Sequence, residues 1–315
     1  MAETAPLYGT EDAPVPEGAA AEWFTGAGGA RLRAALFPAK GAVRGSVILS
    51  GGRTEPIEKY FEVVGEFAAR GFVVLAHDWR GQGLSQRLLS DRLRGHASGS
   101  ADFVTDYAAL IAAFESRLPR PWLAVGHSMG GCLTALILAR GEHRFAGAVL
   151  SAPMLGLHTA PIPPPATRLL ARAMTAFGGG GGSTPGGAPA SFQTNVLTHD
   201  PRRYARNVAQ TAAYPDLALG APTWGWLSFA FDAIAELQKG PGVTRVDVPV
   251  TVVAAGADRI IDNLGTRRVT GRFPKGRYVE APGAYHEVLQ ETDEIRAVFW
   301  REFDAMAATV APAPG

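Results

Sequence analysis

Residues 122–131 read Trp-Leu-Ala-Val-Gly-His-Ser-Met-Gly-Gly. The apolar run Trp122–Val125 is typical of a short buried strand, and the longer run Met129–Arg140 is typical of a helix. Between them, Gly126–Gly130 matches the pattern G-x-S-x-G. In this context the pattern places Ser128 on a sharp strand-to-helix turn that lifts its hydroxyl above a sheet. The flanking glycines fit because a side chain there would collide with the neighbouring strand or helix. The stretch therefore predicts a nucleophilic serine in an α/β fold.

Outside this stretch, short apolar runs alternate with longer amphipathic ones. Continuous apolar runs suit strands that are buried on both faces, and strand–helix alternation favours a parallel sheet between helices. We therefore expect a mostly parallel central sheet with helices on both faces. The expected strands are Gly45–Ser50, Gly71–His77, Trp122–Val125, Ala146–Leu150, Val248–Ala255 and Arg277–Glu280, and the expected helices lie near Glu58–Ala69, Asp102–Glu115, Met129–Arg140 and Glu291–Met306.

The alternation stops over residues 154–240, which indicates an insertion. We expect residues 21–153 and 241–307 to form the core, 154–240 to form a mainly helical cap, and 1–20 and 308–315 to be a flexible arm and tail. The glycine-rich residues 178–187 predict a flexible loop inside the cap. Within residues 166–177, one helical stripe is apolar. Its members are Leu169, Leu170, Ala173, Met174 and Phe177, and they suit either the cap's own core or a surface for an acyl chain or a membrane.

Composition narrows the possible partners and compartments. Lys and Arg number 30 and Asp and Glu 29, so the net charge is +1 and no basic surface for nucleic acid is indicated. The single cysteine, Cys132, excludes an intrachain disulfide and a cysteine-based metal site, and it is expected to be buried. The acidic, Pro- and Ala-rich N-terminus does not resemble a secretory signal, and no window approaches ~20 uninterrupted apolar residues. We expect a cytoplasmic protein, either free or peripheral to the inner face of the membrane.

A serine nucleophile needs a histidine base and an acid that orients the base. In this kind of fold the acid and then the histidine follow the serine along the chain. Of the seven histidines, three come before Ser128 or next to it, one lies at the end of the helix that follows the serine, and two lie in the insertion. Only His286 follows the insertion. Asp258 lies at the carboxyl end of the expected strand Val248–Ala255, and Asp262 is the alternative acid. We predict Ser128, Asp258 and His286 as the catalytic residues.

The oxyanion that forms during attack on a carbonyl group needs two backbone N–H donors. One donor is expected from Met129, directly after the nucleophile. The other is expected from a loop that follows an early strand, where Gly51 and Gly52 precede Arg53 and allow close approach of the backbone. We predict the N–H groups of Arg53 and Met129 as the oxyanion hole.

Taken together, these motifs resemble the α/β-hydrolase superfamily, and within it the serine hydrolases of the monoacylglycerol lipase and lysophospholipase L2 type. The resemblance spans roughly residues 25–305. Besides the serine turn, the segments that carry it are Glu55–Tyr60, Asp78–Ser85, Ser90–His96, Leu219–Trp226 and Gly283–His286. Relatives usually have His-Gly before the oxyanion residue, whereas this chain has Gly51-Gly52. The Arg53 side chain that follows could pair either with a substrate phosphate or with Glu55.

The resemblance implies a carboxylic-ester hydrolase that works through an acyl-enzyme and acts on lysophospholipids or monoacylglycerols. It implies no metal and no organic cofactor. The expected partner is a small ester, with peripheral membrane contact through the cap as a further expectation. A general carboxylesterase and a peptidase or amidase of the same fold remain alternatives, because specificity lies in the cap. A non-catalytic binding protein on the same fold is a third alternative.

Overall fold

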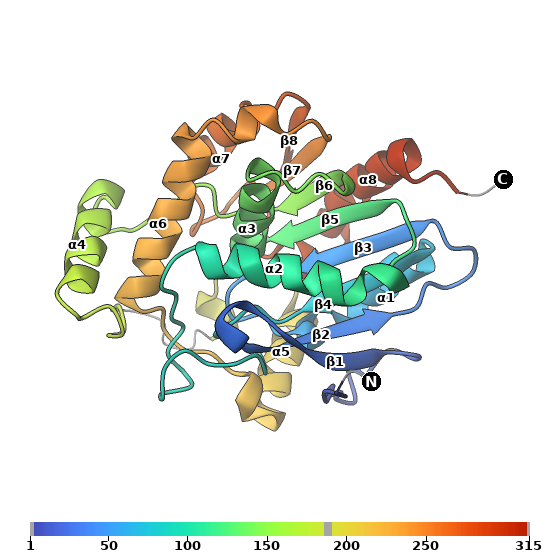
Figure 1. Cartoon of the computed structure of the whole chain (residues 1–315), viewed down its shortest axis with the longest axis horizontal. Helices are drawn as coiled ribbons and strands as arrows, with labels where there is room; N and C mark the ends of the chain where they lie inside the picture. Colours follow the sequence, from blue (N-terminus) through green and yellow to red (C-terminus); the bar gives the residue numbers. More distant parts are fainter. Residues whose placement is uncertain (1–2, 186–190, 314–315) are drawn as a thin grey trace.

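The computed structural model describes residues 3–185 and 191–313 and contains one eight-stranded sheet (Figure 1). The strands follow the order β1-β2-β4-β3-β5-β6-β7-β8 across the sheet. The first two pairings, β1 with β2 and β2 with β4, are antiparallel, and all the others are parallel. The strand bounds are β1 Ala20–Thr25, β2 Arg31–Phe37, β3 Gly45–Ser50, β4 Phe72–His77, β5 Trp122–His127, β6 Phe145–Ser151, β7 Val250–Ala255 and β8 Gly276–Ala281.

Helices cover both faces of the sheet, and each face has its own hydrophobic core. Helices α2 (Ala101–Phe114), α3 (Ser128–Ala139), α6 (Trp224–Lys239) and α7 (Asn263–Thr270) share one core. Helices α1 (Phe61–Ala69) and α8 (Asp293–Val310) share the other. Successive residues of the central strands alternate between the two cores. The expected mostly parallel sheet between two helical layers is therefore confirmed.

Each strand expected from the sequence is present, with its ends within a residue or two of the expected ones. The helix expected near Glu58–Ala69 begins as a 3-10 turn over Ile57–Tyr60 before it continues as α1. The structure also contains elements whose bounds the sequence did not predict. They include strands β1 and β2 and helices α5 (Pro201–Ala213) and α7.

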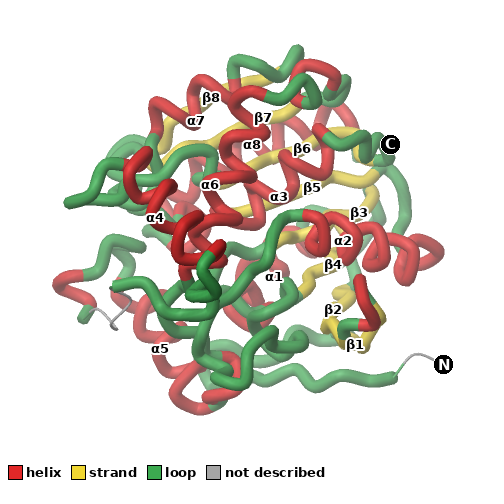
Figure 2. The backbone as a smooth tube through the Cα atoms, turned by 60° about the vertical axis from the view of Figure 1, so that its left-hand side comes forward, coloured by secondary structure: helices red, strands yellow, loops and turns green. Residues whose placement is uncertain are grey.

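The insertion contributes α4 (Pro164–Ala176), α5 and α6. Figure 1 shows α4 beside α6 at one end of the molecule, and Figure 2 shows α5 apart from that pair. Helix α4 buries only Thr167 and Ala171, whereas Leu169 is 71% and Phe177 91% exposed. The apolar stripe expected in this helix is therefore not packed in a core of the cap.

Residues 3–19 of the expected flexible arm, residues 1–20, pack against both the core and the insertion. Ala5 is buried and its N–H donates to the carbonyl of Ala21, while Tyr8 stacks on Tyr214 with 4.4 Å between ring centroids. At the other end, α8 continues to Val310, beyond the expected boundary at residue 307. Residues 1–2 and 314–315 of the expected arm and tail lie outside the described residues.

The first part of the glycine-rich segment is held against the start of α6. The N–H of Trp224 donates to the carbonyl of Gly182, and the N–H of Gly225 donates to that of Gly180. Residues 186 and 187 of this expected loop lie outside the described residues. Across the described chain, none of the helices has both the length and the apolar character needed to cross a membrane.

Candidate active site

The serine turn joins the end of β5 to the first residue of α3. Ser128 has a φ of +50°, a left-handed conformation that is unusual for a residue with a side chain. The glycines around it are required sterically. A Cβ atom on Gly126 would lie 2.8 Å from the backbone of Gly130 and Gly131, and one on Gly130 would overlap the carbonyl oxygen of Ser50. The expected strand–turn–helix context of the serine is present.

Ser128, His286 and Asp258 form one chain of hydrogen bonds. Nε2 of His286 lies 2.9 Å from Oγ of Ser128, and Nδ1 lies 2.8 Å from Oδ2 of Asp258. The other carboxylate oxygen of Asp258 accepts the N–H groups of Ile260 and Ile261, which fixes the carboxylate. The structure thus brings together the three residues predicted from the sequence.

The alternative acid has a different place. A side-chain oxygen of Asp262 accepts the N–H of Leu264 at the start of α7, so Asp262 is a helix cap.

The electrostatics suit proton transfer from serine to histidine. Burial would lower the pKa of His286, but the hydrogen bond and the charge of Asp258 outweigh burial and raise that pKa. Burial would raise the pKa of Asp258, but the hydrogen bond from His286 lowers it. The carboxylate therefore stays ionised and makes the imidazole a stronger base toward Ser128.

The loop Gly51–Arg53 lies beside the nucleophile. A Cβ atom on Gly52 would lie 3.1 Å from Cβ of Ser128. Although this loop has no histidine, the carbonyl of Gly51 accepts the indole N–H of Trp79, and the carbonyl of Gly52 accepts the amide of Gln82. These two side chains, which belong to the motif Asp78–Ser85, hold the loop.

A buried cluster of charges lies behind this loop, and the sequence did not reveal it. The ammonium of Lys59 is 2.8 Å from Glu55 and 2.6 Å from Glu287. Glu55 also accepts the N–H of Gly52 and the hydroxyl of Tyr60. The cluster thus connects the loop beside Ser128 with the residue that follows His286.

The pKa values of groups in and beside this cluster are strongly shifted. Burial would raise the pKa of Glu55, but Lys59 and further partners lower it to about 2. Burial raises the pKa of Glu287, and Lys59 offsets this only in part. Burial also lowers the pKa of His127, whose ring centroid lies 4.9 Å from that of His286, to about 4. The only sequence signal for the cluster was the Glu55–Tyr60 motif, which gives no hint of Glu287.

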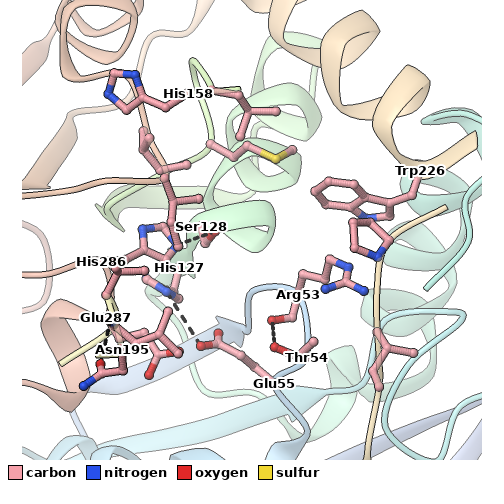
Figure 3. Close-up of a pocket in the computed structure, with 18 of the residues that line it drawn as sticks. Arg53, Thr54, Glu55, His127, Ser128, His158, Asn195, Trp226, His286 and Glu287 are labelled. Atoms are coloured by element: carbon pink, nitrogen blue, oxygen red, sulfur yellow. Dashed lines mark hydrogen bonds and ion pairs between the residues drawn. The ribbon is translucent and has the colours of Figure 1, made fainter. Parts of the chain in front are cut away.

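A cavity of about 500 Å³ opens above Ser128 and His286 (Figure 3). Both the core and the insertion contribute to its wall. Apolar groups supply the larger part of the exposed wall, and the side chains that contribute them include Met154, Leu157, Val196, Leu197, Leu219, Trp226, Leu227, Ile260 and Ile261. Among residues 3–185 and 191–313, no group of His, Cys, Asp and Glu side chains is arranged to hold a metal ion. The cavity therefore offers an apolar enclosure with a serine and a histidine in its wall.

Comparisons with known proteins agree with this geometry. Lysophospholipase L2 of Escherichia coli strain K12 is 34% identical over 292 residues, which cover 87% of this chain and 83% of that protein. The monoacylglycerol lipase of Mycolicibacterium smegmatis is 28% identical over 278 residues, covering 86% of this chain and 91% of that protein.

Among solved structures, a soluble variant of monoglyceride lipase from Saccharomyces cerevisiae, bound to a substrate analogue, has the same fold. Its TM-score is 0.76 at 20% identity, over 97% of this chain and 99% of that one. The sequence profile of the family described as "Serine aminopeptidase, S33" matches residues 41–293. With the serine turn, the sheet order and this match in hand, we conclude that the chain belongs to the S33 family of α/β hydrolases.

Proposed function

We propose that this protein is a serine hydrolase that cleaves the carboxylic ester of lysophospholipids or monoacylglycerols. The observation that carries the proposal is the hydrogen-bonded chain Ser128–His286–Asp258 in the wall of an apolar cavity. An apolar wall suits an acyl chain, and the serine and histidine suit acyl transfer. The names of the relatives from Escherichia coli and Mycolicibacterium smegmatis point to the same two substrate classes.

In the proposed mechanism, Oγ of Ser128 attacks the ester carbonyl carbon while Nε2 of His286 takes the hydroxyl proton. Asp258 holds the imidazole in the required tautomer and stabilises the imidazolium. His286 then donates the proton to the leaving glycerol oxygen, which leaves an acyl group on Ser128. A water molecule, deprotonated by His286, attacks that acyl group and releases the fatty acid.

The negative oxygen of each tetrahedral intermediate needs preorganised donors. We assign this role to the backbone N–H groups of Met129 and Arg53. Met129 is in the first turn of α3, where backbone N–H groups have no partner within the helix. Arg53 belongs to the loop beside Ser128, held by Trp79 and Gln82. The loss of one such donor typically costs about 3–4 kcal/mol of transition-state stabilisation.

The test compares wild type with Ser128→Ala. Wild type should react with a fluorophosphonate probe and release fatty acid from a panel of esters, whereas Ser128→Ala should do neither. Circular dichroism and thermal unfolding of the variant establish that it is folded. The panel includes short p-nitrophenyl esters and an amino-acid amide, which separate a lipid hydrolase from a general esterase or an amidase. Ester turnover by folded Ser128→Ala would refute the assignment.

We further propose that residues 154–240 act as a cap and that the exposed apolar side chains of α4 contact lipid. Leu169 of α4 and Phe177, which directly follows α4, are exposed, and an ester with a long acyl chain resides in a membrane or micelle. Leu169→Glu and Phe177→Glu should reduce co-sedimentation with lipid vesicles. Val43→Glu changes an exposed residue in the loop between β2 and β3 and serves as the matched control. Equal binding by all three variants and wild type would remove the membrane contact.

A further inference from the structure

The guanidinium of Arg53 has an unusual environment for a cation. Among the described residues that line the active-site cavity, it is the only Lys or Arg. One of its nitrogens donates to the carbonyl of Gly220, but in the described part of the chain no carboxylate forms an ion pair with it. Its Nε atom is buried and lacks a hydrogen-bond partner among the described residues. A buried charge without an opposite charge is costly, so such a cation in a cavity marks a candidate binding site.

Glu55 cannot supply the missing charge. Its carboxylate is already occupied by Lys59, Tyr60 and the N–H of Gly52. Burial lowers the pKa of Arg53 to about 10, which leaves the guanidinium charged at neutral pH. Of the two partners that the sequence left open for Arg53, the structure thus removes the protein carboxylate.

The surroundings of Arg53 keep its side chain in the cavity. Figure 3 shows the side chain extending toward Trp226, and its guanidinium carbon lies 5.5 Å from the centroid of the indole ring. On another side, a Cβ atom on Gly95 would lie 2.6 Å from Nη2 of Arg53, so a larger residue at position 95 would displace the guanidinium from this place. Gly95 belongs to the segment Ser90–His96, and Gly220 and Trp226 belong to Leu219–Trp226. Two of the segments that carry the family resemblance therefore meet at this one cation.

The covalent geometry of the substrate matches this placement. In a lysophospholipid acylated at the end of the glycerol, the ester carbonyl carbon and the phosphorus are separated by as many bonds as the backbone nitrogen and the guanidinium carbon of an arginine. A ligand whose carbonyl oxygen accepts the backbone N–H of Arg53 can therefore place its phosphate at the guanidinium of the same residue. A guanidinium also offers paired donors that suit phosphate oxygens.

We propose that the Arg53 side chain binds the phosphate of the substrate head group and makes lysophospholipids the preferred substrates over monoacylglycerols. The proposal rests on the ester-hydrolase function proposed above and adds a residue that determines specificity. A neutral monoacylglycerol leaves the guanidinium without its counter-charge, whereas a phosphodiester supplies that charge.

The test measures kcat/KM for lysophosphatidylethanolamine and for a monoacylglycerol with the same acyl chain. The readout is the ratio of the two values, because any disturbance of the oxyanion loop affects both substrates and cancels. Arg53→Met should lower this ratio about 10- to 100-fold, the effect of losing a hydrogen bond to a charged group. Arg53→Lys keeps the charge and should retain part of the preference. An equal loss on both substrates would mean that Arg53 only fastens the loop at Gly220, and it would overturn the proposal.

A binding measurement separates this proposal from the hydrolase function. Glycerol phosphate should bind to Ser128→Ala in calorimetry, and adding Arg53→Met should weaken that binding about tenfold or more. This result does not depend on ester turnover. Hydrolysis of simple esters by the wild type, together with glycerol phosphate binding that is unaffected by Arg53→Met, would refute the phosphate site and leave the hydrolase function standing.

Discussion

Replacing Lys59 by Met should destabilise the protein strongly, and more so at alkaline pH. The ammonium of Lys59 is buried and lies 2.8 Å from Glu55 and 2.6 Å from Glu287. Its removal leaves two buried carboxylates close together with no cation between them. Breaking a buried pair by removing one partner costs about 3–5 kcal/mol, and this is the loss expected in the free energy of unfolding near neutral pH.

The sign of the pH dependence follows from the two carboxyl groups. Burial already raises the pKa of Glu287, and without Lys59 both carboxyl groups should titrate above their unfolded value of about 4.3. A carboxyl whose folded pKa is raised binds its proton more tightly in the folded state. Its contribution to stability is therefore present at low pH and is lost as the pH rises from the unfolded to the folded pKa. The loss in the free energy of unfolding caused by Lys59→Met should therefore be smaller at about pH 5 than at about pH 8.

Urea unfolding, followed by tryptophan fluorescence at both pH values, measures this loss in the free energy of unfolding. Lys40→Met removes the same charge from an exposed loop and should change the free energy of unfolding by no more than about 0.5 kcal/mol. A loss below about 1 kcal/mol for Lys59→Met at about pH 8, or an equal loss at both pH values, would refute the reasoning.

Four further outcomes are expected. Asp258→Asn should lower kcat on the order of 10⁴-fold and move the acidic limb of kcat/KM to lower pH, because Asp258 raises the pKa of His286; a pH–rate profile measures both effects. Gly130→Ala should cost about 1–3 kcal/mol or prevent folding, because its Cβ would overlap backbone. Gly65→Ala in α1, where a Cβ meets open space, should stabilise by about 0.5–1 kcal/mol, and urea unfolding compares the two. Cys132 should resist iodoacetamide until the protein unfolds, because burial raises its pKa to about 12; native labelling seen by mass spectrometry would contradict this.

The central strands were predictable because burial on both faces produces continuous apolar runs. Strand β3, Gly45–Ser50, has the bounds expected from the sequence. Strand β2 was less clear because it contains Arg33, which is fully buried between Glu58 and Asp78. A charged residue in a sequence usually indicates a solvent-exposed position. The local sequence pattern cannot reveal that two carboxylates from distant parts of the chain neutralise the charge of Arg33.

Helix α5 escaped prediction for a similar reason. Its sequence is polar, and much of its attachment comes from Arg203, which pairs with Glu62 and Asp293. An apolar stripe is the usual signal of a packed helix face, but the residues that α5 buries are the polar Arg203 and Gln210, whereas its apolar Val208 is exposed. Likewise, the contact between Lys59 and Glu287 joins residues 228 positions apart, so no local pattern contains it.

The three residues of the hydrogen-bonded chain were predictable because parallel register converts chain order into proximity. Ser50 pairs with Gly126 at the ends of β3 and β5, and Ala255 pairs with Ala281 at the ends of β7 and β8. The segments that follow these strands therefore leave the sheet at the same edge, and they carry the loop Gly51–Arg53, the serine turn, Asp258 and His286.

The insertion, residues 154–240, which we propose to be a cap, has no comparable register to place its residues over that edge. Its position depends on individual contacts with the core, such as the hydrogen bond from Arg53 to Gly220 and the packing of α6 on α3. Motifs in the core can accordingly predict acyl transfer from sequence alone, whereas the choice of acyl substrate depends on contacts between core and cap. Arg53 is where both kinds of information meet: its backbone belongs to the loop fixed by the core, and its side chain belongs to the wall completed by the cap. For this reason we expect substitutions of the Arg53 side chain to change substrate preference more than the chemistry at Ser128.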